Sequence, residues 1–177
     1  ILFNFERLIL KKQKQMNNTD LEKAFIGMIQ QNERVIYKVC SFYISEDSTL
    51  GDLYQDVVSN LWVAYPKFRN ESAISTWIYR IALNTCISGI RKEMRQPRRV
   101  SFSQLSDVFE QPEDMSAEIK EMYRLIHQLK IVERAIILLY LEEKSYQQIA
   151  DIVGLTVSNV AVKLKRIKEK LVDMSNH

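Results

Sequence analysis

Glycine and proline are scarce in this chain, with only four glycines and three prolines among 177 residues. Chains of strands joined by tight turns need more of both residues. Leu, Ile, Glu, Lys and Gln, which favour helices, are abundant instead. Apolar residues also recur every three to four positions along much of the chain, which is the spacing of one face of a helix. The sequence therefore predicts an all-α fold.

A polar stretch divides the helical patterns into two groups. Residues 96–117 contain two of the three prolines, and this composition is typical of a flexible linker. We expect two small helical domains, at 16–95 and 118–177. Residues 1–15 are expected to be an extension, disordered or helical, because Met16 and the four residues after it resemble a natural start. A helical pattern begins at Asp20. Later periodic patterns predict helices at about 51–65, 74–95, 118–129, 132–143, 146–153 and 157–174.

The composition argues against several classes of protein. The two histidines are isolated, and Cys40 and Cys86 lie in apolar helical patterns. These cysteines are expected to be buried free thiols, with a disulfide as the alternative, so no metal site and no cofactor is expected. The sequence has no glycine-rich phosphate loop and no nucleophile with an identifiable base, which indicates that the protein is not an enzyme. Short apolar runs and the lack of a secretory pattern predict a cytoplasmic protein without membrane insertion.

The C-terminal domain carries the pattern of a helix-turn-helix. Ser145 and Gln148 can form a capping box, Gly154 supplies a tight turn, and Thr156 is a natural N-cap for the last helix. One apolar stripe follows on that helix, formed by Val160, Leu164, Ile167 and Leu171. A short capped helix followed by a longer one with a basic outer face fits the major groove of DNA. The alternative is an ordinary helical hairpin with a solvated basic face.

The helix expected at 74–95 is apolar around most of its circumference. Its polar residues form one narrow strip, made of Arg80, Asn84, Ser88, Arg91 and Arg95. Cations beside aromatic side chains are what single-stranded DNA requires, since the charges hold phosphates and the flat rings stack on bases. A buried helix whose strip is merely solvated is the alternative. Residues 70–99 and 146–177 are net positive and flank a net negative block, which favours two separate nucleic-acid faces.

The first predicted domain contains the motifs Asp52-Leu53-x-Gln55-Asp56, Trp62, Phe68, Thr76-Trp77-Ile78-x-Arg80-Ile81-Ala82-x-Asn84 and Arg91-Lys92. The second contains Leu141-x-x-x-x-Ser145-Tyr-x-x-Ile149-Ala150-x-x-x-Gly154-Leu-Thr156 and Val160-x-x-x-Leu164-x-Arg166. These two sets of residues resemble regions 2 and 4, respectively, of one known family, the extracytoplasmic-function (ECF) sigma factors of the sigma-70 family. The order of the two regions and the short linker between them also match the family.

The resemblance implies a role for each matching position. Residues expected to dock on the clamp of RNA polymerase are Asp52, Leu53, Gln55 and Asp56. Residues expected to contact the minus-ten element are Phe68, Arg69, Asn70, Arg80, Asn84, Ser88, Arg91 and Lys92. Residues expected to read the minus-thirty-five element as duplex are Thr156, Ser158, Asn159, Val162, Lys163 and Arg166. The loop at 68–73 matches the family's loop that captures a flipped base of the non-template strand.

The function implied by the resemblance is that of an alternative sigma factor. Its implied partners are core RNA polymerase (clamp and flap surfaces), promoter DNA and an anti-sigma factor. The sequence departs from the family at Ala161 and Val162, which stand where polar residues are common. The alternative function is a helix-turn-helix regulator with a helical sensor or dimerisation domain. Such a regulator would have an enclosed apolar pocket or a self-complementary face within residues 20–95.

Overall fold

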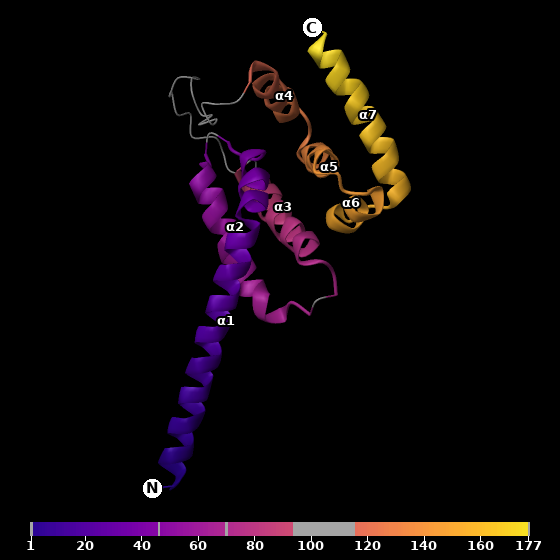
Figure 1. Cartoon of the computed structure of the whole chain (residues 1–177). Helices are drawn as coiled ribbons and strands as arrows, with labels where there is room; N and C mark the ends of the chain where they lie inside the picture. Colours follow the sequence, from indigo (N-terminus) through magenta and orange to yellow (C-terminus); the bar gives the residue numbers. More distant parts are fainter. Residues whose placement is uncertain (1, 46, 70, 94–115, 177) are drawn as a thin grey trace.

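The computed structural model describes residues 2–45, 47–69, 71–93 and 116–176, with side chains from residue 19 onward except that of Glu93. Every regular element in these ranges is helical, which confirms the predicted all-α fold (Figure 1). The α-helices are α1 (Leu2–Ser41), α2 (Leu50–Ala64), α3 (Ile74–Glu93), α4 (Ala117–His127), α5 (Ile131–Leu141), α6 (Tyr146–Val153) and α7 (Val157–Ser175), and a 3-10 turn, η1, covers Tyr65–Lys67.

Helices α1, α2 and α3 pack against one another and form the first domain. Thr49 begins α2, because its hydroxyl accepts the backbone N–H of Asp52 and the Asp52 carboxylate accepts the backbone N–H of Thr49. Pro66 lies in η1 directly after α2, where the sequence predicts the end of that helix. The inner faces of the three helices are fully buried at Ile36, Val39, Val57, Leu61, Ile78 and Ala82.

Helices α4 to α7 form the second domain, and its last two helices have the predicted helix-turn-helix caps. Ser145 and Gln148 make the capping box at the start of α6. Gly154 ends that helix in the left-handed conformation, with φ of 71°. Thr156 then accepts the backbone N–H of Asn159 at 3.3 Å and starts α7. These local bonds fix the angle at which α7 leaves the turn.

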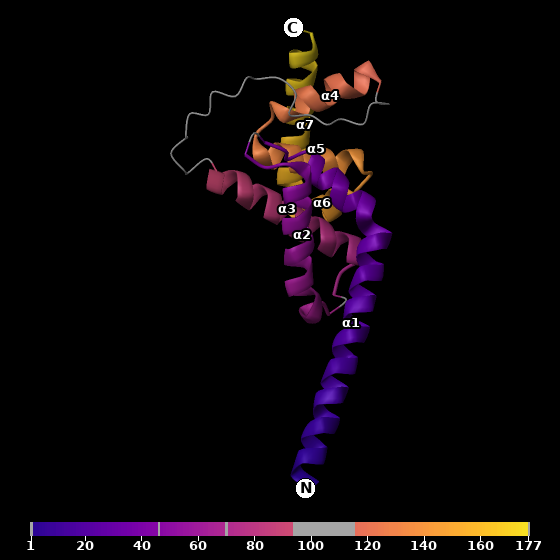
Figure 2. The same ribbon diagram turned by 90° about the vertical axis from the view of Figure 1, so that its left-hand side faces the viewer.

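The two domains lie against each other and share one continuous buried cluster. At the end of α1, the Phe42 ring packs on Tyr123 of α4 with 4.7 Å between ring centroids. The hydroxyl of Tyr43 donates to the carbonyl of Ile131 at 3.1 Å. Figure 2 shows α5 and α6 beside α3. The sequence predicts a tether at 96–117 but not this contact between the domains. Residues 94–115 lie outside the described part of the chain.

The sequence also predicts free cysteines, no metal site and no membrane-spanning helix. Cys40 and Cys86 are buried and free, as predicted. A hydrogen bond with Cys40 and burial raise the pKa of the Cys86 thiol, so it stays protonated at neutral pH. In the described ranges, no three His, Cys, Asp or Glu side chains are grouped as metal ligands would be. Within those same ranges, every helix is too short or too polar to span a bilayer.

Replacing Gly154 by alanine should reduce stability, because an L side chain with φ near 71° is strained. We expect Gly154→Ala to lower the free energy of unfolding by roughly 1–2 kcal/mol. Gly89→Ala in α3 is the matched control, since a Cβ at either position meets no atom within 4 Å. That change should stabilise the chain by ~0.5–1 kcal/mol because alanine is the better helix former. Urea denaturation measures the free energy of unfolding of both variants, and equal changes from the wild type would contradict the prediction.

Candidate nucleic-acid interface

The polar strip on α3 is exposed along its described length. Arg80 and Asn84 lie one turn apart and are exposed, while Ile78 and Ala82 on the opposite face are fully buried. The strip continues, also exposed, with Ser88 and Arg91, and the exposed Lys92 adjoins it. Arg95, the last residue of the predicted strip, lies outside the described residues. Its burial pattern is the one that the sequence predicts, with a largely buried helix leaving a narrow basic edge in solvent. Five polar side chains in a row can follow the backbone of a nucleic acid strand.

An aromatic cluster fixes the segment that precedes α3. The Phe68 ring packs on Trp77 at 4.8 Å between centroids, and Tyr65 lies 6.4 Å from the same indole. Phe25 of α1 extends the cluster, with its ring 5.3 Å from Tyr65. The sequence predicts flat surfaces near the strip but not that α1 contributes to them. The start of the 68–73 loop is therefore held by ring packing before any DNA is present.

Arg69 and Asn70 follow Phe68 in the loop. Arg69 has a side chain that is 82% exposed, and its ion pair with Glu71 is long, at 3.9 Å. Such an exposed pair contributes little to stability, so the guanidinium can exchange the carboxylate for a phosphate. Asn70 lies outside the described residues.

Helix α7 presents the predicted reading face to solvent. Ser158, Asn159, Val162, Lys163 and Arg166 are all exposed, whereas Val160, Leu164 and Ile167 on the other side are buried. Val162 is 51% exposed, so its side chain is accessible to a partner. An aliphatic side chain on this face can pack on the methyl group of thymine.

The five cations of α7 fall into two groups. Lys165 pairs with Glu169 at 3.9 Å, and Lys170 pairs with Glu133 at 3.6 Å. Lys168 lies over the ring of Tyr140, with 3.8 Å from Nζ to the centroid. Lys163 and Arg166 are exposed and make no hydrogen bond or ion pair within the described residues. These two cations are therefore the best placed on α7 to hold phosphates.

The four residues of α2 expected to dock on polymerase differ in exposure and in their local hydrogen bonds. Leu53 is only 4% exposed and belongs to the core, so its side chain is not available to a partner, which corrects its place in the predicted set. Asp52 is exposed but closes the capping box with Thr49. Gln55 and Asp56 are exposed on the same side of α2. Asp56 is therefore the acidic residue of α2 whose charge has no role in capping the helix and can meet a partner.

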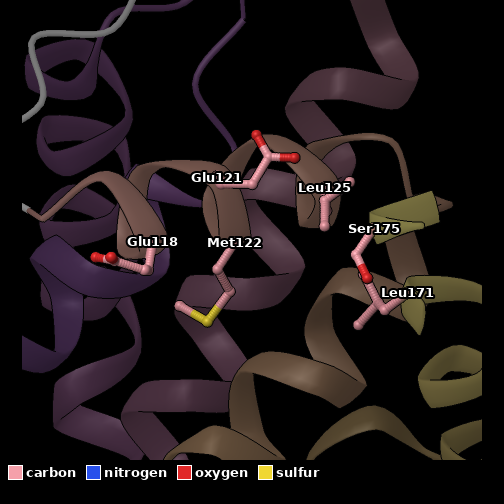
Figure 3. Close-up of a pocket in the computed structure, with 6 residues that line it drawn as sticks. All are labelled: Glu118, Glu121, Met122, Leu125, Leu171 and Ser175. Carbon is pink, nitrogen blue, oxygen red and sulfur yellow. The ribbon is translucent and has the colours of Figure 1, made fainter. Parts of the chain in front are cut away.

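A shallow groove lies between α4 and α7 (Figure 3). Its floor is apolar, formed by Met122, Leu125 and Leu171, and Glu118, Glu121 and Ser175 line its edge. The Glu121 carboxylate takes two hydrogen bonds from Arg124, which lower the pKa of that carboxyl. The groove lies outside residues 20–95, where the alternative sensor function would place its pocket.

Fold and surfaces together define the class of protein. It is a two-domain helical DNA-binding protein, with a basic strip beside aromatic rings in one domain and a helix-turn-helix in the other. Residues 28–96 match the family model described as Sigma-70 region 2, and residues 119–171 match the one described as Sigma-70, region 4.

Relatives in several bacteria agree with both family models. RNA polymerase sigma factor YlaC of Bacillus subtilis is 30% identical over 134 residues, which cover 70% of this chain and 75% of that protein. The ECF RNA polymerase sigma-E factor of Haemophilus influenzae is 28% identical, with 85% of this chain and 86% of that protein covered. The chain belongs to the sigma-70 family and is an ECF-type alternative sigma factor, which directs transcription initiation. Sigma factors are DNA-binding initiation factors and not enzymes.

Two solved structures share the fold. The sigma factor RpoE, in complex with the anti-sigma factor NepR from Bartonella quintana, superposes with a TM-score of 0.72 at 21% identity, covering 87% of this chain and 98% of that one. CnrH, in complex with the cytosolic domain of CnrY, gives a TM-score of 0.63 at 21% identity, covering 88% of this chain and 89% of that one. Both domains of the chain are therefore present in a known architecture.

The exposed face of α7 generates a prediction about base preference. Asn159 can make paired hydrogen bonds to adenine, and Val162 can contact thymine. We expect Asn159→Ala and Val162→Ser each to cost ~1–3 kcal/mol and to relax preference at one base pair of the minus-thirty-five element. Arg166→Ala should instead weaken binding to all sequences alike. It should also lower the slope of log affinity against log salt concentration by about one.

The measurement is binding to a library of minus-thirty-five duplexes at several salt concentrations. Lys165→Ala is the control for Arg166→Ala, since Lys165 already pairs with Glu169. An unchanged preferred sequence in Val162→Ser would show that Val162 reads no base. A changed base preference in Arg166→Ala would show that the roles on α7 are divided differently.

Proposed function

We propose that this sigma factor divides promoter recognition between three surfaces. The exposed side of α2 binds core polymerase, α3 with the 68–73 loop selects the minus-ten element as single strand, and α7 reads the minus-thirty-five element as duplex. The observation that carries the proposal is the strip on α3, whose exposed cations run beside a ring cluster already packed in place. A face built only for duplex phosphates would need no such rings.

Selection of melted DNA follows from the chemistry of the strip and loop. Arg80, Arg91 and Lys92 supply charges for phosphates, and Asn84 and Ser88 can donate and accept hydrogen bonds with bases. Turning a base out of the stack costs a few kcal/mol, which contacts in a pocket must offset. The loop that begins at Phe68 is the proposed pocket, because ring packing holds its start and the exposed Arg69 can exchange its long ion pair with Glu71 for a phosphate.

Docking on polymerase is assigned to Gln55 and Asp56, with Asp52 at the edge of the same surface. Asp52 lies in the first turn of α2, where a carboxylate is favourable to the helix. Asp56 lies one turn further along, and its carboxylate is exposed to solvent. A basic surface on the polymerase clamp is the proposed partner of α2, and the flap is the proposed partner of the second domain. The anti-sigma factor NepR in the solved complex with RpoE supports an anti-sigma partner here. We also propose that the protein works in the cytoplasm, where polymerase is found.

Reversing the charge of Asp56 should weaken polymerase binding. Asp56→Arg would place a cation against a basic surface, and we expect a clear loss of affinity for purified core polymerase in the absence of DNA. Far-UV circular dichroism should not change, because Asp56 is exposed. Glu169→Arg, which makes the same change of net charge on α7, is the matched control. If the two variants bind core polymerase with equal affinity, Asp56 does not contact the polymerase.

The polymerase complex should prefer single-stranded non-template minus-ten DNA over the same duplex. We expect the preference to shrink in Arg80→Ala and Asn84→Ala, and the affinity to fall with rising salt. Arg124→Ala on α4 is the control, since that guanidinium pairs with Glu121. Titration of labelled oligonucleotides measures the affinities. Equal binding of single strand and duplex would indicate a phosphate-binding patch without base capture.

A further inference from the structure

An exposed amide of α2 lies beside the polar strip of α3. The Nδ2 of Asn60 donates to the hydroxyl oxygen of Thr85 at 3.0 Å. Thr85 directly follows Asn84 of the strip, and its own hydroxyl donates to the carbonyl of Ile81 at 2.9 Å. The strip therefore has a neighbour from another helix at the position of Thr85. The sequence did not predict a role in DNA binding for Asn60.

These two hydrogen bonds determine which way the Asn60 amide points. A hydroxyl has one hydrogen, and that of Thr85 is donated to the carbonyl of Ile81, so the Thr85 oxygen can only accept from Asn60. The group that faces Thr85 must then be the NH2 of the amide and not its oxygen. The Oδ1 atom and the second N–H of Asn60 have no partner among the described residues, and this side chain is exposed.

An amide held in this way is better suited to the edge of a base than to a phosphate. Its oxygen accepts and its remaining N–H donates, whereas a phosphate offers acceptors alone. Asp56 lies one turn earlier on α2 and is exposed, and its negative charge repels a phosphate. Arg80 is the cation of the strip nearest to Thr85 in the sequence, and it donates to the backbone carbonyl of Asp151 in α6 at 3.0 Å. The polar group that lies at Thr85 is the neutral amide of Asn60.

Adenine is the base that this amide matches. Its N6 amine donates and its N7 accepts, so an asparagine can bind both atoms at once. Guanine presents acceptors at both corresponding positions, O6 and N7, and the amide oxygen would meet one of them. We propose that Asn60 is a further specificity-determining residue, which binds an unpaired adenine of the minus-ten strand, and that Thr85 is the positioning residue that orients it. The inference rests on the proposed function of α3.

The adenine bound by Asn60 is a different nucleotide from the base captured in the 68–73 loop. Trp77, which packs on Phe68 of that loop, and Thr85 are eight residues apart on α3, which is about 12 Å along the helix. Successive nucleotides of a stacked strand are only ~3.4 Å apart. Base preference at the two sites can therefore be lost separately.

Base analogues test the contact in the complex with core polymerase. Single-stranded non-template minus-ten DNA, from a promoter that the complex transcribes, carries an analogue at one adenine at a time. The analogues are 7-deazaadenine, which lacks N7, and hypoxanthine, which has a carbonyl in place of the N6 amine. We expect the wild type to lose about five-fold or more in affinity with either analogue at one position. Asn60→Ala should bind the natural and analogue strands equally there.

Three further variants separate base reading from fold. Thr85→Val keeps the shape of the side chain but removes the acceptor, so it should lose the same preference, and Thr85→Ser should keep it. Gln31→Ala, which removes an exposed amide from α1, is the matched control and should behave as the wild type. A wild-type preference in Thr85→Val would overturn the positioning role.

The outcomes for Asn60→Ala distinguish this inference from the proposed function. If this variant keeps the wild-type response to the analogues, or weakens binding to all bases alike, Asn60 does not read adenine. The same conclusion follows if no adenine of the strand responds to both analogues in the wild type. A wild type that still prefers single strand over duplex would then leave the proposed function of α3 standing. A wild type that binds both forms equally would overturn the proposed function and this inference with it.

Discussion

The end of α1 is where the two domains become one body, and the contacts between them depend on its two aromatic residues. Phe42 and Tyr43 are almost fully buried, and both contact the second domain. Burying a large side chain of this kind stabilises a structure by ~1.5–3 kcal/mol. The Tyr43 hydroxyl keeps a partner in the carbonyl of Ile131, so its burial leaves no unpaired polar group. Apolar packing at this point sets the orientation in which Glu142, at the end of α5, pairs with Lys38 of α1 and accepts a hydrogen bond from the Tyr79 hydroxyl of α3.

The packing of the two domains against each other is nevertheless a balance of opposing terms. Releasing one domain from the other restores conformational freedom along the tether and at the surface side chains of the junction. Hydrogen bonds to charged groups contribute about 1.5–3 kcal/mol each, and such a change alters an equilibrium by a factor of ten or more. A few polar contacts can therefore decide how often the domains separate, even though buried rings determine how they meet.

The sequence predicts the features that local chemistry determines. Ser145, Gly154 and Thr156 each act within a few residues of themselves, and the structure has their caps and turn as predicted. The exposed strip on α3 and the buried stripe on α7 follow from helical periodicity in the same way. The pairing of Thr49 with Asp52 was readable as well, since a threonine three residues before an acidic residue is a capping signal. Leu53 belongs to the apolar face of its helix, and that spacing already indicated burial.

Contacts between distant parts of the chain could not be read in this way. Lys38 and Glu142 are 104 residues apart, and Arg80 and Asp151 are 71 apart. No periodicity links such pairs, because their meeting depends on how two complete domains pack. Phe25 joins the ring cluster at Tyr65 for the same reason. Position within a helix was predictable from one sequence, whereas the partners of Arg80 and Glu142 required the assembled fold.

The partial exposure of the Lys38–Glu142 pair has a consequence for how salt acts on this protein. Lys38 is 43% exposed and Glu142 is 22% exposed, so dissolved ions reach the pair and screen it. Rising ionic strength therefore weakens this ion pair at the junction of the two domains. The packing of Phe42 and Tyr43 is not screened, because both side chains are buried. At high salt the contact between the domains consequently depends more on these two rings than on the charges around them.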